Sequence, residues 1–292
     1  MCRLLGLTAG HEPISASFWL LDAPDSLEVQ SRRNADGSGI GFFDLSGAPV
    51  LDKQPEPAFR DKEFVREARQ ARAATFVSHV RYATAGGATL ENTHPFTMRG
   101  RIMAHNGGIG DIGRLDDQLG RYGELVLGDT DSERFFALIT QQVDAHGGDV
   151  GAGIAAAASW IGTRLPISSL NTVVATPGQL WALRYPAQHA LHIIERRAGA
   201  STPPATAADG AAAAPGLHVR SATSSVHAPA LQALPSVVVA SEELDGESGW
   251  RMLAPGELVH VRPDLTVESA MVIPDPPAHL VPLPADNPNI DT

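Results

Sequence analysis

The residue best suited to chemistry is Cys2, the only cysteine among 292 residues and the direct neighbour of Met1. Removal of Met1 would leave a thiol and a free α-amine on the same residue. Their ordinary pKa values, about 8.5 and about 8, place a nucleophile and a base near neutral pH. A nucleophile that carries its own base is an established form of covalent catalysis. The alternative interpretation of Cys2 is that it is a small apolar side chain at the start of a buried strand, without a catalytic role.

Six short motifs, the first containing Cys2, carry residue types used in amide chemistry. The motifs are Met1–Gly6 (MCRLLG), Asn34–Gly39 (NADGSG), His79–Thr84 (HVRYAT), Glu91–Phe96 (ENTHPF), His105–Gly108 (HNGG) and Gly128–Glu133 (GDTDSE). Each motif alone is weak evidence, but six in a fixed order form a specific pattern. In this pattern the chain resembles the class II, or N-terminal nucleophile, glutamine amidotransferases, and within them a stand-alone, YafJ-like branch. The resemblance extends from residue 2 to about 140 and continues more weakly through 238–261.

The resemblance assigns three residues to substrate binding. A γ-glutamyl amide presents an α-carboxylate, an α-ammonium and the scissile amide. Arg81 stands where the family binds the carboxylate, and the planar fork of a guanidinium suits a bidentate contact. Thr84 stands where the family has a hydroxyl near that carboxylate, and Asp131 where an acidic residue accepts the ammonium. Each residue also has a structural interpretation: Arg81 as part of a surface ion pair, Thr84 as a strand end, and Asp131 as a charge that complements a helix N-terminus.

Asn106 and Gly107 match the family's oxyanion hole, in which N–H groups stabilise the negative charge that develops on the amide oxygen. An Asn-Gly dipeptide is also typical of a tight turn. We expect His94 to hold a loop near the site, and His79 and His105 to be strand histidines with satisfied hydrogen bonds. We expect no metal and no cofactor, because the three histidines lie in separate motifs, without a cysteine partner or an HExxH spacing.

The segment Gly108–Gly113 (GIGDIG) offers a competing hypothesis, since it satisfies the GxGxxG pattern of dinucleotide binding. It follows an expected strand, opens an expected helix and precedes Asp129 by about the right spacing. Two observations disfavour it. The strand carries the polar His105 and Asn106, where a central parallel strand would be continuously apolar. No further βαβ unit follows residue 160.

The elements that must position these residues follow a strand–helix–strand order. This order favours an α+β fold with antiparallel sheets packed on helices. The family resemblance implies a four-layer αββα sandwich of the N-terminal nucleophile hydrolase type. Helices are expected over Asp61–Arg72, Ile112–Tyr122, Asp131–His146 and Val150–Trp160. Strands are expected over Cys2–Thr8, Gly39–Leu45, Ala74–Tyr82, Arg101–His105, Asn171–Ala175, Gln179–Arg184, Leu191–Arg196, Leu217–Ser221, Ser236–Ser241 and Glu257–Arg262.

We expect one catalytic domain over residues 2–272, with a low-complexity Ala/Pro insertion at 198–216 and a Pro-rich tail at 273–292, either disordered or an extended strap. The sequence shows no signal peptide and no apolar run of about 20 residues. A single cysteine fits a reducing cytoplasm. The net charge of -11 disfavours nucleic acids and anionic membrane surfaces as partners.

The resemblance implies hydrolysis of glutamine or another γ-glutamyl amide through a Cys2 thioester. The glutaminase fold is expected to occupy most of the chain. Either an unidentified partner protein then supplies the ammonia acceptor, or water is the acceptor of the γ-glutamyl group and the protein is a γ-glutamyl amidohydrolase. The stretch Asn34–Asp44 (NADGSGIGFFD) also resembles the γ-glutamyl amidohydrolase of ergothioneine biosynthesis, which is the alternative substrate class. A third hypothesis is a catalytically inactive, glutamine-binding protein. Ser38 departs from the family pattern, since relatives often carry tryptophan there.

Overall fold

The computed structural model describes residues 2–83, 86–197, 217–220, 225–228 and 234–282. Its centre is formed by two seven-stranded sheets, with the orders β13-β9-β12-β1-β4-β2-β3 and β15-β14-β8-β7-β6-β5, and with β16 paired to β7 in the second. The first sheet contains β1 (Arg3–Thr8), β2 (Ser38–Phe43), β3 (Pro49–Gln54), β4 (Thr75–Val80), β9 (His192–Arg196), β12 (Ser236–Ala240) and β13 (Arg251–Met252). The second contains β5 (Phe96–Met98), β6 (Arg101–Ile109), β7 (Pro166–Thr176), β8 (Gln179–Leu183), β14 (Glu257–Val261), β15 (Val267–Met271) and β16 (His279–Leu280). A separate hairpin pairs β10 (Leu217–Arg220) with β11 (Ser225–Ala228).

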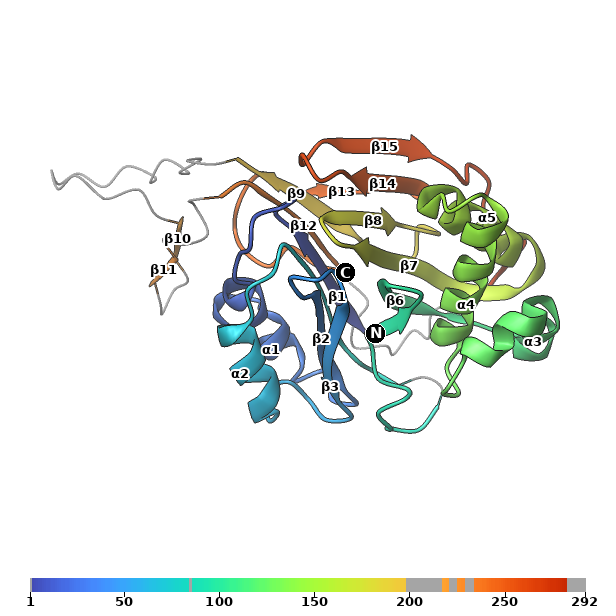
Figure 1. The fold of residues 1–292 in the computed structure, drawn as a ribbon, viewed down its shortest axis with the longest axis horizontal. Helices are drawn as coiled ribbons and strands as arrows, with labels where there is room; N and C mark the ends of the chain where they lie inside the picture. Colours follow the sequence, from blue (N-terminus) through green and yellow to red (C-terminus); the bar gives the residue numbers. More distant parts are fainter. Residues whose placement is uncertain (1, 84–85, 198–216, 221–224, 229–233, 283–292) are drawn as a thin grey trace, which may run out of the picture.

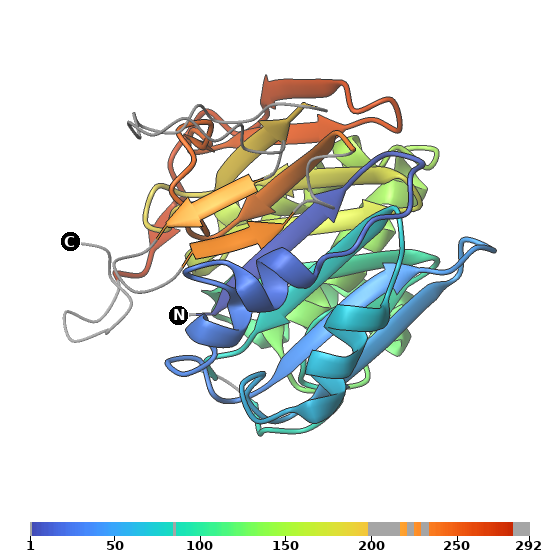
Figure 2. The same ribbon diagram turned by 90° about the vertical axis from the view of Figure 1, so that its left-hand side faces the viewer.

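Helices cover the outer face of each sheet, so the molecule has four layers (Figure 1). Seen from the side, α1 and α2 lie on the face of the first sheet that points away from the second sheet (Figure 2). Three hydrophobic cores fill the three layer interfaces. The α+β class and the αββα sandwich expected from the sequence are therefore confirmed. The helices are η1 (Phe18–Asp22), α1 (Leu27–Gln30) and α2 (Lys62–Gln70) on the first sheet, and α3 (Ile112–Leu119), η2 (Gly120–Leu125), α4 (Asp131–Ala145) and α5 (Val150–Arg164) on the second.

The central strand β1 shows how the two-residue period of a strand builds this sandwich. Leu5 and Leu7 are buried under the helices of the first layer, whereas Leu4 is buried between the two sheets. Gly6 also faces the second sheet, where an added Cβ would lie 2.7 Å from a methyl group of Leu180. Glycine at this position therefore lets the two sheets approach each other closely at the middle of β1.

Helices α4 and α5 illustrate why the sequence forms the layer over the second sheet. The hydroxyl of Thr130 accepts a hydrogen bond from the Glu133 backbone N–H (3.2 Å), which caps the start of α4. Asp149 caps α5 in the same way through the Ala152 N–H (3.0 Å). The two helices pack closely at Gly153, where an added Cβ would collide with Val143.

The sheet topology excludes the dinucleotide-binding hypothesis. Strand β6 pairs antiparallel with both β5 and β7, so Gly108–Gly113 does not follow a parallel strand of a βαβ unit. The polar residues of β6 indicated the same conclusion from the sequence. A nucleotide fingerprint requires the strand–turn–helix geometry of a parallel sheet, and this chain lacks it there.

Part of the C-terminal region lies along the second sheet. Strand β16 pairs in parallel with the start of β7, and the Val281 backbone N–H donates to the Ile167 carbonyl (2.8 Å). The Tyr185 hydroxyl donates to the Asp275 carbonyl (3.1 Å). Residues 273–282 thus form an extended strap, whereas the insertion at 198–216 and residues 283–292 lie outside the described residues. Within the described segments, no helix combines the length and the apolar character needed to cross a membrane.

Candidate active site

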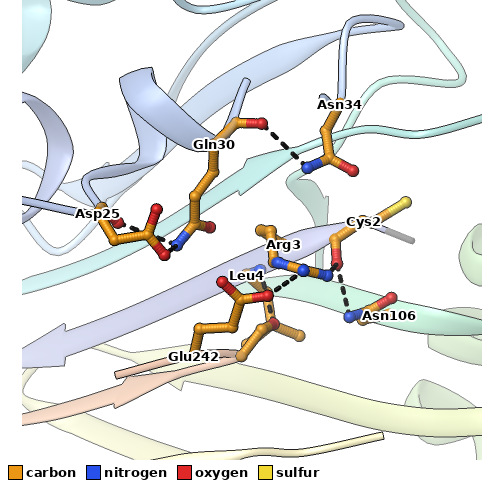
Figure 3. Close-up of polar contacts among 9 residues, drawn as sticks. Cys2, Arg3, Leu4, Asp25, Gln30, Asn34, Asn106 and Glu242 are labelled. Carbon is orange, nitrogen blue, oxygen red and sulfur yellow. Dashed lines mark hydrogen bonds and ion pairs between the residues drawn. The ribbon is translucent and has the colours of Figure 1, made fainter. Parts of the chain in front are cut away.

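Cys2 lies at the start of the central strand of the first sheet, between β4 and β12. Its sulfur accepts a hydrogen bond from the Tyr82 backbone N–H (3.2 Å), and its thiol faces the Tyr82 carbonyl (3.3 Å). The side-chain amide of Asn106, from the second sheet, donates to the Cys2 carbonyl (2.7 Å; Figure 3). Residues about 80 and 100 positions apart in the sequence therefore meet around the one cysteine.

Two further contacts fix the backbone that follows Cys2. The buried guanidinium of Arg3 forms an ion pair with Glu242 (Figure 3). The Leu4 backbone N–H donates to the hydroxyl of Ser241 (3.0 Å), and the Leu4 carbonyl accepts from the Ser241 N–H (3.1 Å). The loop after β12 thus holds the start of β1 from one side, while Tyr82 holds it from the other.

The surroundings of Cys2 keep its thiol protonated. Burial raises the pKa of this thiol, and the negative charge of Asp131 raises it further. The hydrogen bond from Tyr82 and the positive charges of the N-terminal ammonium and of Arg81 lower the pKa, but they offset burial only in part. Since the thiolate is the nucleophilic form, attack by Cys2 needs a nearby base to take the thiol proton.

Asn106 and Gly107 lie within β6, opposite Asn171 and Leu170 of β7, so the turn that an Asn-Gly pair can form is not present here. The side chain of Asn106 is buried and points at Cys2, with its Oδ1 atom unpartnered within the described residues. An added Cβ at Gly107 would overlap the Ser169 carbonyl oxygen. Only glycine therefore fits this position beside Asn106.

Arg81 is buried directly after β4, one residue before Tyr82. Its guanidinium donates to the carbonyls of Gly87 (3.1 Å) and Gly86 (3.3 Å), so it is held by the loop that precedes β5. Its backbone N–H donates to the Gly37 carbonyl (2.8 Å), which ties the first of the motif loops to the end of β4. Thr84, the other residue expected at the substrate carboxylate, lies outside the described residues.

Asp131 is the first residue of α4, and its carboxylate accepts a hydrogen bond from the Ile109 backbone N–H at the end of β6 (2.8 Å). A negative charge at this position also interacts favourably with the helix dipole. Asp131 affects the pKa values of both Cys2 and His105, because its charge acts on both across the buried site. The residue therefore has a structural role in addition to the role in ammonium binding that the resemblance implies.

His105 has a defined protonation state. Its Nε2 atom contacts the Ser169 carbonyl (3.2 Å), which only accepts, so Nε2 carries the proton. Its Nδ1 atom then accepts from the Ser132 hydroxyl (2.9 Å). Burial lowers the pKa of His105, in agreement with this neutral form. The expectation of a satisfied, buried strand histidine is confirmed for this residue.

His79 differs from that expectation, and it lies against His94, which is expected to hold a loop near the site. Their rings stack at a centroid distance of 4.1 Å, and no ring nitrogen of the pair has a hydrogen-bond partner among the described residues. Burial lowers the pKa of His79 to about 3 and the pKa of His94 well below its usual value, so both rings are neutral. His94 belongs to the segment that leads into β5, so its ring packs this loop against β4. No group of three or more His, Cys, Asp or Glu residues in the described segments could hold a metal ion.

One residue at the site has no role that its motif predicts. Asn34 belongs to the NADGSG element, and its side chain is buried and turned toward Cys2 (Figure 3). A further link, from the Asp129 backbone N–H to the Asn92 side-chain oxygen (2.7 Å), joins the loop before β5 to the loop before α4. Only the fold brings these loops together, although each contains one of the six motifs.

Comparison with known proteins agrees with this arrangement. The family model described as class II glutamine amidotransferases matches residues 1–275. The chain is 38% identical over 117 residues to the γ-glutamyl-hercynylcysteine sulfoxide hydrolase of Mycobacterium tuberculosis, which covers 37% of this chain and 49% of that protein. It is 31% identical over 153 residues to the glutamine amidotransferase homologue YafJ of Escherichia coli, covering 49% of this chain and 55% of that protein. The chain thus spans about half the length of these curated relatives.

The same comparison extends to solved structures. The glutamine phosphoribosylpyrophosphate amidotransferase from B. subtilis superimposes with a TM-score of 0.62 and 18% identity, over 94% of this chain and 50% of that chain. At this identity the likeness concerns the fold alone, and it agrees with the four-layer αββα sandwich. The six ordered motifs, the fold and the family model all agree, and the chain belongs to the class II glutamine amidotransferases.

Proposed function

We propose that this protein hydrolyses the γ-carboxamide of glutamine, or of a related γ-glutamyl amide, through a thioester on Cys2. The observation that carries the proposal is the position of Cys2, whose sulfur is held by Tyr82 and whose carbonyl is held by Asn106. Removal of Met1 would create an α-amine on the same residue. This amine supplies the base that takes the proton of the thiol.

The first half of the reaction forms the thioester. The Cys2 sulfur bonds to the amide carbon while the α-amine takes the thiol proton, and the amide oxygen becomes negatively charged. The Asn106 side-chain amide and the Gly107 backbone N–H are the groups we assign to stabilising that charge. When the C–N bond breaks, the α-ammonium returns its proton to the leaving nitrogen, so ammonia or an amine departs as a neutral molecule.

The second half releases glutamate. Water attacks the thioester carbon, and the α-amine takes one proton from this water. The C–S bond then breaks, the sulfur regains the proton, and the free acid leaves. We assign Arg81 with Thr84 to the substrate α-carboxylate and Asp131 to the α-ammonium. The ammonia from the first half of the reaction is released into solvent in this scheme, and its delivery to a synthase partner is the second possibility.

A second candidate substrate is the γ-glutamyl amide of a thiol-histidine derivative. It is favoured by the 38% identity to the γ-glutamyl-hercynylcysteine sulfoxide hydrolase. The two candidates differ in the leaving group, which is ammonia for glutamine and a bulky amine for the derivative. Comparison of kcat/KM for glutamine and for a series of γ-glutamyl amides with leaving groups of increasing size separates them.

The same substrate series tests the proposal as a whole. We expect glutamate release from at least one member to require Cys2. Glutamine binding in calorimetry, without glutamate release from any member, would instead support an inactive binding protein. The absence of both binding and release would remove γ-glutamyl amides as the substrate class.

Arg81→Ala is expected to weaken substrate binding. Loss of a charged partner for a buried carboxylate costs about 2–5 kcal/mol, so KM for the preferred amide should rise by about 30-fold or more. Arg81→Lys keeps the charge but loses the fork, and its KM should lie between those of the wild type and of Arg81→Ala. Steady-state kinetics measures both values, and thermal melting shows whether loss of the contacts to Gly86 and Gly87 has unfolded the site. An unchanged KM in folded Arg81→Ala would remove Arg81 from the substrate carboxylate.

A further inference from the structure

Asn34 is a buried polar residue beside Cys2 that the reaction scheme above does not use. It is 1% exposed, and its Oδ1 atom has no hydrogen-bond partner among the described residues. A buried amide oxygen without a donor is costly, so it points to a donor that the chain acquires later. Figure 3 shows the amide of Asn34 turned toward the side chain of Cys2, with Asn106 on the opposite side of Cys2.

The orientation of the Asn34 amide is fixed by a short chain of contacts. The Gln30 side-chain nitrogen donates to both the backbone carbonyl and the carboxylate of Asp25, at 2.9 Å each. The Gln30 backbone carbonyl, at the end of α1, accepts from the Asn34 Nδ2 atom (3.0 Å). Since a carbonyl only accepts, Asn34 must turn its nitrogen toward Gln30. Its oxygen is therefore the atom presented to the site.

The backbone around Asn34 is tied to the same strand end that holds the Cys2 sulfur. The Asp36 backbone N–H donates to the Arg81 carbonyl (3.0 Å), and the Asp36 carboxylate accepts from the Ala83 N–H (2.8 Å). Tyr82, whose backbone contacts the thiol, lies between Arg81 and Ala83. The loop that contains Asn34 is thus attached to the site, through Asp36, by contacts on both sides of Tyr82.

The Cys2 thiol has both of its partners in Tyr82 and does not need the Asn34 oxygen. Asn106 presents a second unpartnered oxygen, because its nitrogen already donates to the Cys2 carbonyl. Two acceptors without donors therefore flank a single residue. A neutral primary amine has two N–H groups and one lone pair. If both N–H groups are bound by acceptors, the direction of the lone pair is fixed as well.

We infer that Asn34 is a positioning residue for the α-amine of matured Cys2, binding one N–H through Oδ1 while Asn106 Oδ1 binds the other. This inference rests on the proposed function, since it concerns the base of that reaction. The two amide oxygens direct the lone pair of the amine toward the thiol and the leaving nitrogen. After the amine takes the thiol proton, the same oxygens stabilise the ammonium.

The inference predicts opposite changes in two variants. Asn34→Ala removes an acceptor that favours the ammonium form, so the pKa of the α-amine should fall by about half a unit or more. Asn34→Asp adds a negative charge near the amine, so this pKa should rise, by about one unit or more. In both variants kcat should fall by about 10-fold or more, because the lone pair is no longer held in place.

A single cysteine allows a direct measurement. Labelling with ¹³C,¹⁵N-cysteine gives one labelled residue, whose Cα shift follows the titration of the α-amine and whose Cβ shift follows the thiol. The matched control is Ser38→Ala, which removes one buried hydrogen bond, to the Glu56 carbonyl (2.9 Å), from the strand that follows the same loop. We expect its amine pKa to equal that of the wild type.

The outcomes separate this inference from the proposed function. An amine pKa that is the same in wild type, Asn34→Ala and Asn34→Asp, or one that moves in the same direction in both variants, overturns the role of Asn34. Asn34→Asp keeps the shape of the side chain, so it preserves the test if Asn34→Ala fails to fold. A wild-type signal of an amide rather than an amine overturns the inference because Met1 is then retained. Absence of Cys2-dependent hydrolysis together with opposite pKa shifts refutes the proposed reaction and leaves the placement of Asn34 intact.

Discussion

Replacing Cys2 by alanine should abolish release of glutamate and of ammonia or amine from the preferred γ-glutamyl amide. Removing a nucleophile that works as a unit with its base costs about 10³-fold or more in kcat. The chain offers no substitute thiol, because Cys2 is its only cysteine. The measurement is coupled detection of glutamate and of the released nitrogen, on wild type and variant at equal concentration. Equal rates would remove Cys2 from the reaction.

Two companion measurements make that result specific. Cys2→Ser keeps the size of the side chain and the free α-amine, but a hydroxyl is a weaker nucleophile, so it should also lose most activity while retaining substrate binding. Intact mass shows whether Met1 is absent from the active protein. An active protein that retains Met1 would contradict the α-amine as base, even if Cys2→Ala is inactive.

The parts of the fold that the sequence predicted are those with strong local signals. Helix α4 has a capping threonine, acidic residues in its first turn and an apolar face, and its expected and observed bounds agree within one residue. By contrast, β3 (Pro49–Gln54) is an edge strand with no fully buried residue and both Asp52 and Lys53 in it, so its sequence lacks the alternation of a half-buried strand. Helix α1 has only four residues, too few for a periodic pattern.

Strand β6 shows how tertiary context can override local composition. The expected strand ended at His105, because the following Asn-Gly-Gly is typical of a turn. In the structure β6 continues to Ile109, since Gly107 lies against the Ser169 carbonyl, which leaves no space for a side chain. The glycines serve close packing between strands, and this need is not visible in the sequence of either strand alone.

The candidate site also contains both residues that the sequence could assign and residues that only the structure could assign. Residues within the motifs of the family could be named from the sequence, and the structure places Cys2, Arg81, Asn106, Gly107 and Asp131 around the ends of β1, β4 and β6. Asn34 could not be assigned, because its importance depends on an unpartnered oxygen and on a contact to Gln30. The ion pair of Arg3 with Glu242 joins residues 239 positions apart, which only the pairing of β1 with β12 explains.

Asn106→Ala should have the second largest effect on catalysis. Loss of one oxyanion donor lowers kcat by about 10²–10³-fold, because the charge on the amide oxygen develops only after attack. KM should change little, since the ground-state amide oxygen is neutral. The same substitution also removes the hydrogen bond to the Cys2 carbonyl (2.7 Å), so single-turnover kinetics should show that thioester formation is the slowed step.

A control on the neighbouring strand separates this loss from a loosened sheet. Thr172→Val on β7 removes one buried hydrogen bond, to the Ala104 carbonyl of β6 (2.8 Å), without removing a group that faces Cys2. It should lower the free energy of unfolding by about 1 kcal/mol and leave kcat near the wild-type value. If Asn106→Ala and Thr172→Val lose kcat equally, Asn106 acts through the integrity of the sheet and not on the oxyanion. A large loss confined to Asn106→Ala, with unchanged KM and a normal melting temperature, supports a direct role of the Asn106 side chain in attack by Cys2, through the oxyanion and through the amine contact inferred above.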